Sequence, residues 1–469
     1  MVSQQKRRAE RTSQADWNER AHLCQTGVPR QEATSFEKPA QRHLKMDVLH
    51  QILRKENLSY AFKHVLSNKG SAGVDGIGTD QLKDHLQLHW PKVRVSIEYG
   101  RYQPQAILGV SIPKRNGGAR ILGIPTTTDR MLQQAIHQVL SPMFEPEFSA
   151  FSYGFRPNKH AGQAILQSLS YINQGYQQIV NIDLKSFFDE VNHDHLMNLI
   201  KSKVTDPRVI RLIWRYLRSP MQFNGKLHKR RQGVPQGGPL SPLLSNIVLN
   251  ELDQELERRG LRFVRYADDF SIFVKTPLAA HRVKRRITLF IEAKLHLKVN
   301  TKKSAICKPL NYEYLGYAFE SSYLKGVRGH YQLVVSKASL TTLKYKIKMI
   351  TRKTIPMSFD ERIARLNLLM RGWLQYFKFA SIQAKLKALD GWVRNRLRYC
   401  IWHHWKKPKR RVKNLIRLGV VPDMAWQWGH SRMGGWAVSC SPILGTTITL
   451  ERLNQRGYLS FLDYYLKIR

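Results

Sequence analysis

The sequence has few cysteines, no long apolar run and no apolar leader. Its four cysteines are far apart among 469 residues and form no C-x-x-C pair, a pattern that supports neither a zinc site nor a disulfide framework. No stretch approaches the roughly 18 apolar residues of a membrane-spanning helix, so we expect no membrane partner. The start is basic but lacks the apolar region of a signal peptide, which indicates an intracellular setting.

Acidic residues are also scarce relative to basic ones. The chain has 77 Lys and Arg against 34 Asp and Glu, a formal charge of +43. A charge of this size predicts a polyanionic partner. The 42% of hydrophobic and 10% of aromatic residues exceed what a disordered basic tail carries. We therefore expect a folded protein that binds nucleic acid.

Composition and periodicity divide the chain into four predicted regions. A polar start with weak periodicity is followed by a long stretch in which short β-like runs alternate with helical patterns, which predicts an α+β body. A basic helical stretch and a Trp- and Gly-rich end complete the chain. The predicted regions are an N-terminal extension at 1–44, the α+β body at 45–335, a helical domain at 336–407 and a C-terminal module at 408–469.

The helical domain belongs to the most basic stretch. Between positions 337 and 417, 22 Lys and Arg stand against three acids. Leu366, Leu369, Trp373 and Tyr376 recur at helical spacing and predict one apolar helix face, so we assign Trp373, like Trp392, to packing. The basic faces are the better expectation for RNA contact. The residues that we expect there are Lys406, Lys407, Lys409, Arg410 and Arg411.

Three aspartates stand where strands are predicted to end. The β-like run 179–182 leads into Asp183, and the segment 261–275 has the pattern of a strand, a tight turn and a strand, with Asp268 and Asp269 at the tip. If these strands pair, the three carboxylates converge. Carboxylate oxygens suit hard divalent cations, and two such cations clamp the attacking and leaving oxygens of phosphoryl transfer.

Each of these aspartates also has an ordinary structural interpretation. An isolated Ala-Asp-Asp is usually a solvated hairpin turn, and Asp183 alone fits a helix N-cap. A third element weighs against both interpretations. The Gly- and Pro-rich start of the segment 231–253 runs directly into an amphipathic helix, so backbone N–H groups can approach a ligand closely. A plain turn would not need Gln236 between Pro235 and two glycines.

Together these blocks resemble those of reverse transcriptases, and more closely those encoded by group II introns. Asp183 with the following Phe-Phe pair, the run GVPQGGPLSPLLSNIVL and the tetrapeptide YADD carry the resemblance. Further blocks match in order, at 110–135 and 151–165 for the fingers, at 297–306 and 312–319 for the palm, and at 366–380 for the thumb. The resemblance implies an α+β right-hand polymerase with fingers, an antiparallel palm, a helical thumb or maturase domain and a small C-terminal module.

The resemblance also implies roles for the residues that match. Asp183, Asp268 and Asp269 become the catalytic ligands of two Mg²⁺ ions, with Mn²⁺ as a second possibility. Leu184, next to Asp183, is placed at the metal and the dNTP. Lys303 becomes the proton donor to the leaving pyrophosphate, although the neighbouring Lys302 competes for that role, and the alternative for both lysines is phosphate binding alone.

Further matches concern the incoming nucleotide and the template and primer strands. Lys114 and Arg120 resemble the pair that holds the triphosphate, Gln236 would lie under the base and sugar, and Phe188 resembles the steric gate against a 2′-OH, with Phe187 as its rival. Arg156 is either a template contact or a buried structural arginine. The turn that would grip the primer end consists of Tyr314, Leu315 and Gly316.

The expected function is an RNA-directed DNA polymerase that binds group II intron RNA, assists its splicing and copies it into DNA. Its partners would be RNA, DNA and dNTPs, in the cytoplasm of a bacterium and associated with the nucleoid. Two alternatives stay open: a splicing maturase that only binds RNA, and a host-adopted polymerase in DNA repair or defence. The last 50 residues hold one cysteine and one histidine, so we expect no HNH endonuclease and priming from nicks or replication forks. Trp426, Trp428 and Trp436 indicate a nucleic-acid-binding module there.

Overall fold

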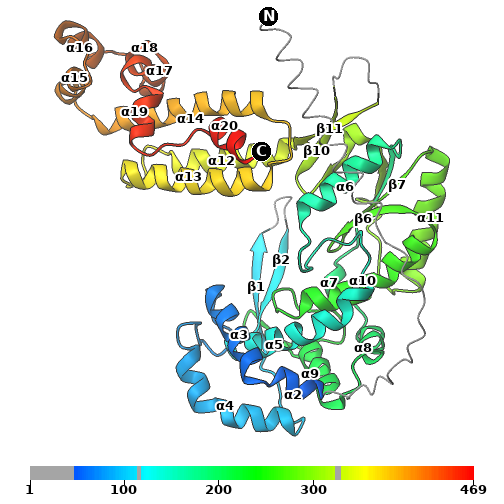
Figure 1. Cartoon of the computed structure of the whole chain (residues 1–469). Coiled ribbons are helices and arrows are strands. Elements are labelled where there is room, and N and C mark those ends of the chain that lie inside the picture. The colour runs from blue at the N-terminus through cyan, green and yellow to red at the C-terminus, as the bar shows by residue number, and fades with distance from the viewer. Residues whose placement is uncertain (1–46, 114–117, 323–328) are drawn as a thin grey trace, which may run out of the picture. The chain divides into compact units, whose positions relative to one another are not determined.

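The computed structural model describes residues 47–113, 118–322 and 329–469, so the predicted extension at 1–44 lies outside the described residues. Within these ranges helices and mainly antiparallel sheets alternate, which confirms the α+β class (Figure 1). In the same ranges no helix is both long and apolar enough to cross a membrane.

The described part of the chain begins with helices that contact α5. Helix α3 packs most extensively against it. Asn57 fixes this pair because its side-chain amide donates to the carbonyls of Ile52 and Ala135. The helices of this part are α2 (Val48–Ile52), α3 (Lys55–Ser67), α4 (Leu82–Glu98), α5 (Thr127–Phe144) and the short η1 (Glu145–Glu147).

A four-stranded sheet contains a hairpin of the predicted fingers, formed by β1 and β2. We call it the basic hairpin because it carries Arg120. The order of the sheet is β2-β1-β4-β5, with β1 antiparallel to β2 and parallel to β4. In this hairpin Ile112 lies opposite Arg120. The strands are β1 (Ile107–Pro113), β2 (Ala119–Ile124), β4 (Met221–Phe223) and β5 (Lys226–His228).

The second four-stranded sheet carries the three aspartates. Its order is β6-β7-β3-β8, and β3 pairs antiparallel with β7 so that Ile182 lies opposite Phe270. This confirms the pairing on which the predicted convergence depends. The strands are β3 (Gln178–Ile182), β6 (Arg262–Tyr266), β7 (Asp269–Val274) and β8 (Ala305–Cys307).

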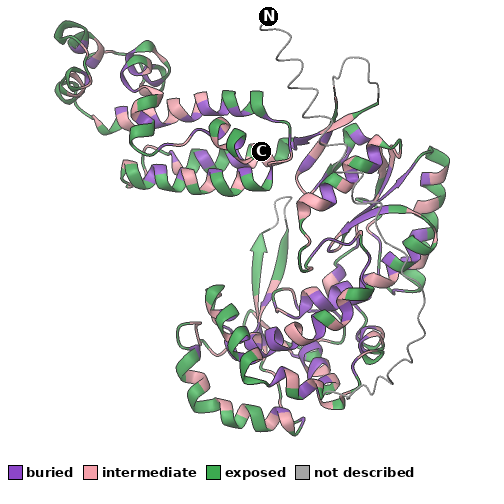
Figure 2. Cartoon of the chain, in the orientation of Figure 1, coloured by how far each residue is buried: buried purple, intermediate pink, exposed green. Residues whose placement is uncertain are grey.

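Both faces of this second sheet are covered. Val180 and Ile272 belong to a core shared with α10 and α11, whereas Ile179 and Phe273 belong to a second core shared with α6 (Figure 2). Burial on both sides explains why the residues around the aspartates are continuously apolar. The helices of this part are α6 (Ala161–Asn173), α7 (Phe187–Glu190), α8 (His193–Lys201), α9 (Pro207–Arg218), α10 (Ser241–Arg258), α11 (Pro277–Ala293) and η2 (Pro309–Asn311).

A three-stranded sheet leads into the helical domain. Its order is β11-β10-β9, with β9 (Glu313–Tyr314), β10 (Tyr317–Ser321) and β11 (Tyr331–Val335). Three long helices follow, α12 (Lys337–Ile350), α13 (Phe359–Tyr376) and α14 (Gln383–His404). The buried face of α13 is centred on Ile363, Leu366, Met370 and Leu374. Tyr376, expected on the apolar face, is 43% exposed.

The C-terminal part consists of short helices, and the last one returns to the helical domain. Helix α20 packs against α13 and α14. The buried carboxylate of Asp390 on α14 accepts hydrogen bonds from the hydroxyls of Tyr458 and Ser460 and from the amides of Phe461 and Leu462. The helices are α15 (Pro408–Arg417), α16 (Pro422–Gly429), α17 (Gly435–Cys440), α18 (Pro442–Thr447), α19 (Leu450–Gln455) and α20 (Phe461–Ile468).

Candidate active site

The three aspartates lie at one end of the second four-stranded sheet. Asp183 follows the last residue of β3, and Asp268 lies in the two-residue turn between β6 and β7, where Tyr266 pairs with Asp269. Ala267 has a φ of +59°, a left-handed conformation that a residue with a Cβ adopts at a cost. The turn therefore places its carboxylates by a backbone geometry that the surrounding structure must hold.

Charge repulsion is built into this end of the sheet. Burial and the negative charge of Asp183 raise the pKa of Asp268, while the positive charge of Arg120 opposes that shift. Desolvation and the charges of Asp268 and Asp183 raise the pKa of Asp269 to about 6, and Lys303 acts in the opposite direction. Asp268 and Asp269 are therefore hard to ionise beside Asp183. A cation is favoured here because it would offset the repulsion between the carboxylates.

The donor set fits divalent cations that keep other ligands. In the described ranges, no three Asp, Glu, His or Cys side chains are arranged to hold a metal ion by themselves. Mg²⁺ usually retains water and substrate phosphate oxygens and takes only one or two carboxylates from the protein. The aspartates therefore fit a divalent cation that keeps water or substrate phosphate oxygens among its ligands, and they do not form a closed structural metal site.

Asp183 is held by a residue that the sequence did not single out. The side-chain amide of Asn300 donates to Asp183 Oδ2 over 2.9 Å, and its backbone N–H donates to the Asp183 carbonyl over 2.8 Å. Lys303 Nζ lies 3.8 Å from the same carboxylate oxygen. Its position favours Lys303 over Lys302, which has no such contact among the ion pairs of the described residues.

A pocket of about 720 Å³ opens beside the aspartates. One side is acidic, with Asp183 and Asp268, and another carries the cations that follow β5. Of the nine residues predicted for catalysis and dNTP binding, seven line this pocket, and Asp269 lies outside its lining. The seven are Arg120, Asp183, Leu184, Phe188, Gln236, Asp268 and Lys303. Lys114 lies outside the described residues, and the side chain of Leu184 is buried, so this residue offers the pocket its backbone.

The two phenylalanines have different surroundings. Phe187 is 2% exposed and belongs to the hydrophobic core, whereas Phe188 is half-buried, and both border the pocket. The Val234 N–H donates to the Phe188 carbonyl over 2.6 Å, which brings the Pro-Gln-Gly loop alongside. The greater exposure of Phe188 favours it over Phe187, and the gate role stays a prediction.

The Pro-Gln-Gly loop closes against the basic hairpin. The Gly123 N–H donates to the Gln236 carbonyl over 2.7 Å. Gly237 has a φ of +126°, and a Cβ there would lie 2.4 Å from the Gly123 carbonyl oxygen. Only glycine fits this position, and the close approach fixes Gln236 beside Arg120 and Phe188.

A second cavity adjoins the first pocket, and the residues that line both, Arg120, Phe188 and Gln236, form a wall between them. The second cavity has a volume of about 650 Å³. Its other lining residues come mainly from α3 and α5, among them His64 and Arg130, and from the Pro-Gln-Gly loop and the start of α10. The sequence contained no signal for it, since the residues of α3 and α5 stand in ordinary amphipathic helices.

Several predicted nucleic-acid contacts are placed differently. The Arg156 side chain is 6% exposed, and its guanidinium donates to Glu145 and to the carbonyls of Ser149 and Ser152. Its position matches the structural alternative, because no donor group faces solvent. Tyr314 is also buried, and its hydroxyl donates to the Asp269 carbonyl over 3.1 Å.

The predicted primer turn is a tight hairpin. Leu315 and Gly316 have φ values of +49° and +81°, and they join β9 to β10. The Tyr376 hydroxyl of α13 donates to the Leu315 carbonyl over 2.9 Å. The Gly316 carbonyl accepts from the Ser336 N–H and the Ser339 hydroxyl. The turn is therefore tied to the helical domain, and its role at the primer stays a prediction.

Most of the predicted RNA-contacting cations are exposed. Lys406, Lys407, Lys409 and Arg410 face solvent at the start of α15, whereas Arg411 stacks its guanidinium 4.5 Å from the ring centre of Trp402. Arg411 thus contributes to packing. The other four remain available for phosphate contacts.

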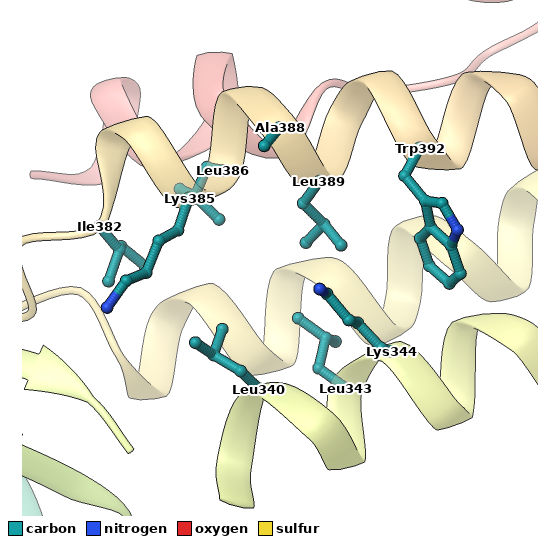
Figure 3. A pocket seen from close by; sticks show the side chains of 9 residues that line it. All are labelled: Leu340, Leu343, Lys344, Ile382, Lys385, Leu386, Ala388, Leu389 and Trp392. Carbon is teal, nitrogen blue, oxygen red and sulfur yellow. The ribbon is translucent and has the colours of Figure 1, made fainter. Parts of the chain in front are cut away.

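The helical domain has its own hollow, which carries no reacting groups. About 530 Å³ lies between α12 and α14, and Figure 3 shows leucines of both helices at this hollow, together with Lys344, Lys385 and Trp392. Its lining includes no acid, histidine, cysteine or hydroxyl. Chemistry therefore belongs to the pocket beside the aspartates.

The chain is similar to known proteins along most of its length. Residues 112–319 match the family model for reverse transcriptase (RNA-dependent DNA polymerase), and residues 323–419 match the model for the group II intron maturase-specific domain. Protein YkfC of Escherichia coli (strain K12) is 33% identical over 299 residues, which cover 55% of this chain and 78% of YkfC.

A second curated relative is longer than the part that this chain matches. The group II intron-encoded protein LtrA of Lactococcus lactis subsp. cremoris is 30% identical over 322 residues, covering 66% of this chain and 52% of LtrA. The chain thus spans about half the length of LtrA. Among solved structures, a partial Cas6-RT-Cas1–Cas2 complex aligns with a TM-score of 0.36 and 24% identity, over 57% of this chain and 46% of the other.

Proposed function

Because the chain belongs to the reverse transcriptases that carry a group II intron maturase-specific domain, we propose that it copies RNA into DNA by nucleotidyl transfer with two Mg²⁺ ions. Its family consists of RNA-dependent DNA polymerases, which bind nucleic acid and use divalent metal ions. The observation that carries the proposal is the convergence of Asp183, Asp268 and Asp269 beside a pocket with a basic rim.

The predicted site residues in and beside the pocket have proposed tasks. Asp183 and Asp268 in its lining, together with Asp269, would hold the cations, which would stabilise the charge that develops as the primer 3′-OH displaces pyrophosphate from the dNTP. Asn300 keeps the Asp183 carboxylate in one orientation. Arg120 and Lys303 bind the phosphates, because fixed cations beside a phosphate form strong charge-assisted hydrogen bonds.

The wall between the two cavities separates the incoming dNTP from the template base. The dNTP occupies the pocket that holds Asp268, and the template base occupies the cavity lined by α3 and α5. Gln236 and Phe188 face both cavities.

We propose that residues 45–335 form the fingers and palm, that residues 336–407 form the thumb, and that residues 408–469 form a nucleic-acid-binding module that acts at bacterial DNA.

Phe188→Ala is expected to raise the use of ribonucleotides relative to deoxyribonucleotides by about tenfold or more, since filling or emptying an apolar pocket changes discrimination on this scale. The assay is single-nucleotide extension of a primed RNA template with Mg²⁺. Phe187→Ala serves as the control, because loss of a core phenylalanine costs about 3–5 kcal/mol of stability and should leave sugar choice unchanged. Relaxed sugar choice in the Phe187 variant alone would reverse the assignment.

We also propose that the chain binds group II intron RNA and assists its splicing. Replacing Lys406, Lys407, Lys409 and Arg410 by glutamine is expected to weaken binding of the intron RNA and to reduce the slope of log K against log salt by up to about 3, since each lost phosphate contact removes about 0.7–0.9. Splicing support should fall in parallel, while extension of a short primed template persists. An unchanged salt slope would show that these four cations do not contact the RNA.

A further inference from the structure

Arg265 is a fully buried cation directly beside the catalytic turn. Its side chain and that of Asp253 on α10 are both 0% exposed. Arg265 Nε donates to Asp253 Oδ1 over 2.7 Å, and Nη2 donates to Oδ2 over 2.5 Å. This bidentate pair fixes the plane of the guanidinium.

The third nitrogen of Arg265 reaches the turn itself. Nη1 donates to the carbonyl of Ala267 over 2.9 Å and to Asn246 Oδ1 over 2.9 Å. Ala267 is the left-handed residue that immediately precedes Asp268. A residue held in that region costs about 1–3 kcal/mol and persists only where neighbouring contacts hold it.

The other side of the turn is closed by backbone. A Cβ on Gly154 would lie 2.2 Å from the Ala267 nitrogen, so the two main chains are in close contact. Asn246 links both sides, because its amide donates to the Gly154 carbonyl over 2.9 Å while its oxygen accepts from Arg265. Ala267 is thus held between Arg265 and Gly154.

Stability alone does not account for this arrangement. Apolar residues of similar volume are often as stable as a buried ion pair, or more stable, because two charges must leave water. Here the planar guanidinium makes four hydrogen bonds to three partners, one more than the three N–H groups of a lysine can make. The property that the pair adds is a fixed position for the Ala267 carbonyl.

We propose that Arg265, held by Asp253 and Asn246, is a positioning residue that fixes the Ala267 carbonyl and thereby aims the Asp268 carboxylate at the divalent cation. This inference rests on the proposed role of Asp268 in cation binding. Groups that orient the ligands of a metal ion typically change its affinity by 10- to 100-fold when they are replaced.

The test measures the binding of Mn²⁺ alone to the full chain. Electron paramagnetic resonance monitors this binding in the absence of nucleotide. Arg265→Lys keeps the charge opposite Asp253 but loses the fork, and we expect its Kd for Mn²⁺ to rise about tenfold or more. The Mg²⁺ concentration for half-maximal primer extension should rise in parallel.

Arg362→Lys is the matched control. Arg362 is also buried, and its guanidinium donates to the backbone carbonyls of Ile350, Arg352 and Ile355 in the helical domain. Its replacement should lower Tm without changing the Kd for Mn²⁺. Asn246→Ala, which leaves the ion pair in place, is a second variant in case Arg265→Lys does not fold, and it should weaken Mn²⁺ binding in the same direction.

The outcomes separate the two proposals. Wild-type Mn²⁺ affinity in folded Arg265→Lys, or equal loss in Arg362→Lys, overturns the positioning role while the aspartates keep theirs. If Asp268→Ala binds Mn²⁺ as the wild type does, the proposed cation site is wrong and the positioning role falls with it.

Discussion

Asp268→Ala is expected to abolish primer extension on RNA, with a fall in rate of at least about a thousandfold. The carboxylate is the one at the tip of the catalytic turn, and it faces the pocket with Asp183. Cation stabilisation of the transferring phosphoryl group supplies several kcal/mol, and each 1.4 kcal/mol is a factor of ten in rate. The measurement is single-turnover addition of one dNTP to a primed RNA template with Mg²⁺.

Loss of the fold is not expected to explain that result. Burial and the charge of Asp183 already disfavour the ionised form of Asp268, so its removal relieves repulsion, and Tm without added metal should stay the same or rise. Asp194→Ala, at an exposed position on α8, provides a control that should extend primers normally. Extension by Asp268→Ala within tenfold of the wild type would contradict the proposed mechanism.

The proposed catalytic aspartates could be placed from sequence because each stands at the end of a short strand or in a tight turn. A strand that ends at Asp183 and a hairpin with Asp268 at its tip are visible as short apolar runs broken by a turn. The register between the strands could not be read in the same way, because both faces of the sheet are buried and a shift by one residue would move each apolar side chain from one core to the other. The α+β class and the helix after the Pro-Gln-Gly loop were predictable from local patterns.

Other features depend on partners far away in sequence. Asn300 reaches Asp183 across 117 positions, and nothing in its own neighbourhood marks it. Arg156 was open between template and structure because its acceptors, Glu145 and two backbone carbonyls, carry no pattern. Phe187 and Phe188 could not be distinguished because α7 has only four residues, too few for a periodicity.

The same limit applies to the helical domain. The apolar residues of α13 recur at helical spacing, yet the buried face is centred on Met370 and Leu374, one step around the helix from Leu369 and Trp373. Helix α20 packs against α13, although the two helices are far apart in the sequence. Periodicity predicted the helix correctly, but which of its faces is buried depends on this long-range packing.

Gly154→Ala is expected to lower kcat for primer extension by about tenfold or more and to reduce stability by about 1–3 kcal/mol, the usual cost of overpacking. A Cβ at this position would lie 2.2 Å from the Ala267 nitrogen and 3.0 Å from its Cα. Both are backbone atoms, so no flexible side chain can move aside. The added methyl group must displace the turn that carries Asp268.

A matched substitution separates the effect on the turn from the effect of the methyl group itself. A Cβ on Gly372, within α13, would meet no atom within 4 Å, and alanine is favoured over glycine inside a helix by about 1 kcal/mol. Gly372→Ala should therefore raise Tm and leave kcat unchanged. If Gly154→Ala matched wild-type kcat well below its Tm, the position of the Ala267 backbone would not limit the reaction. A loss of kcat with an unchanged KM for the dNTP would instead place the damage at the aspartates, because the nucleotide-binding wall formed by Gln236 and Phe188 lies on other segments.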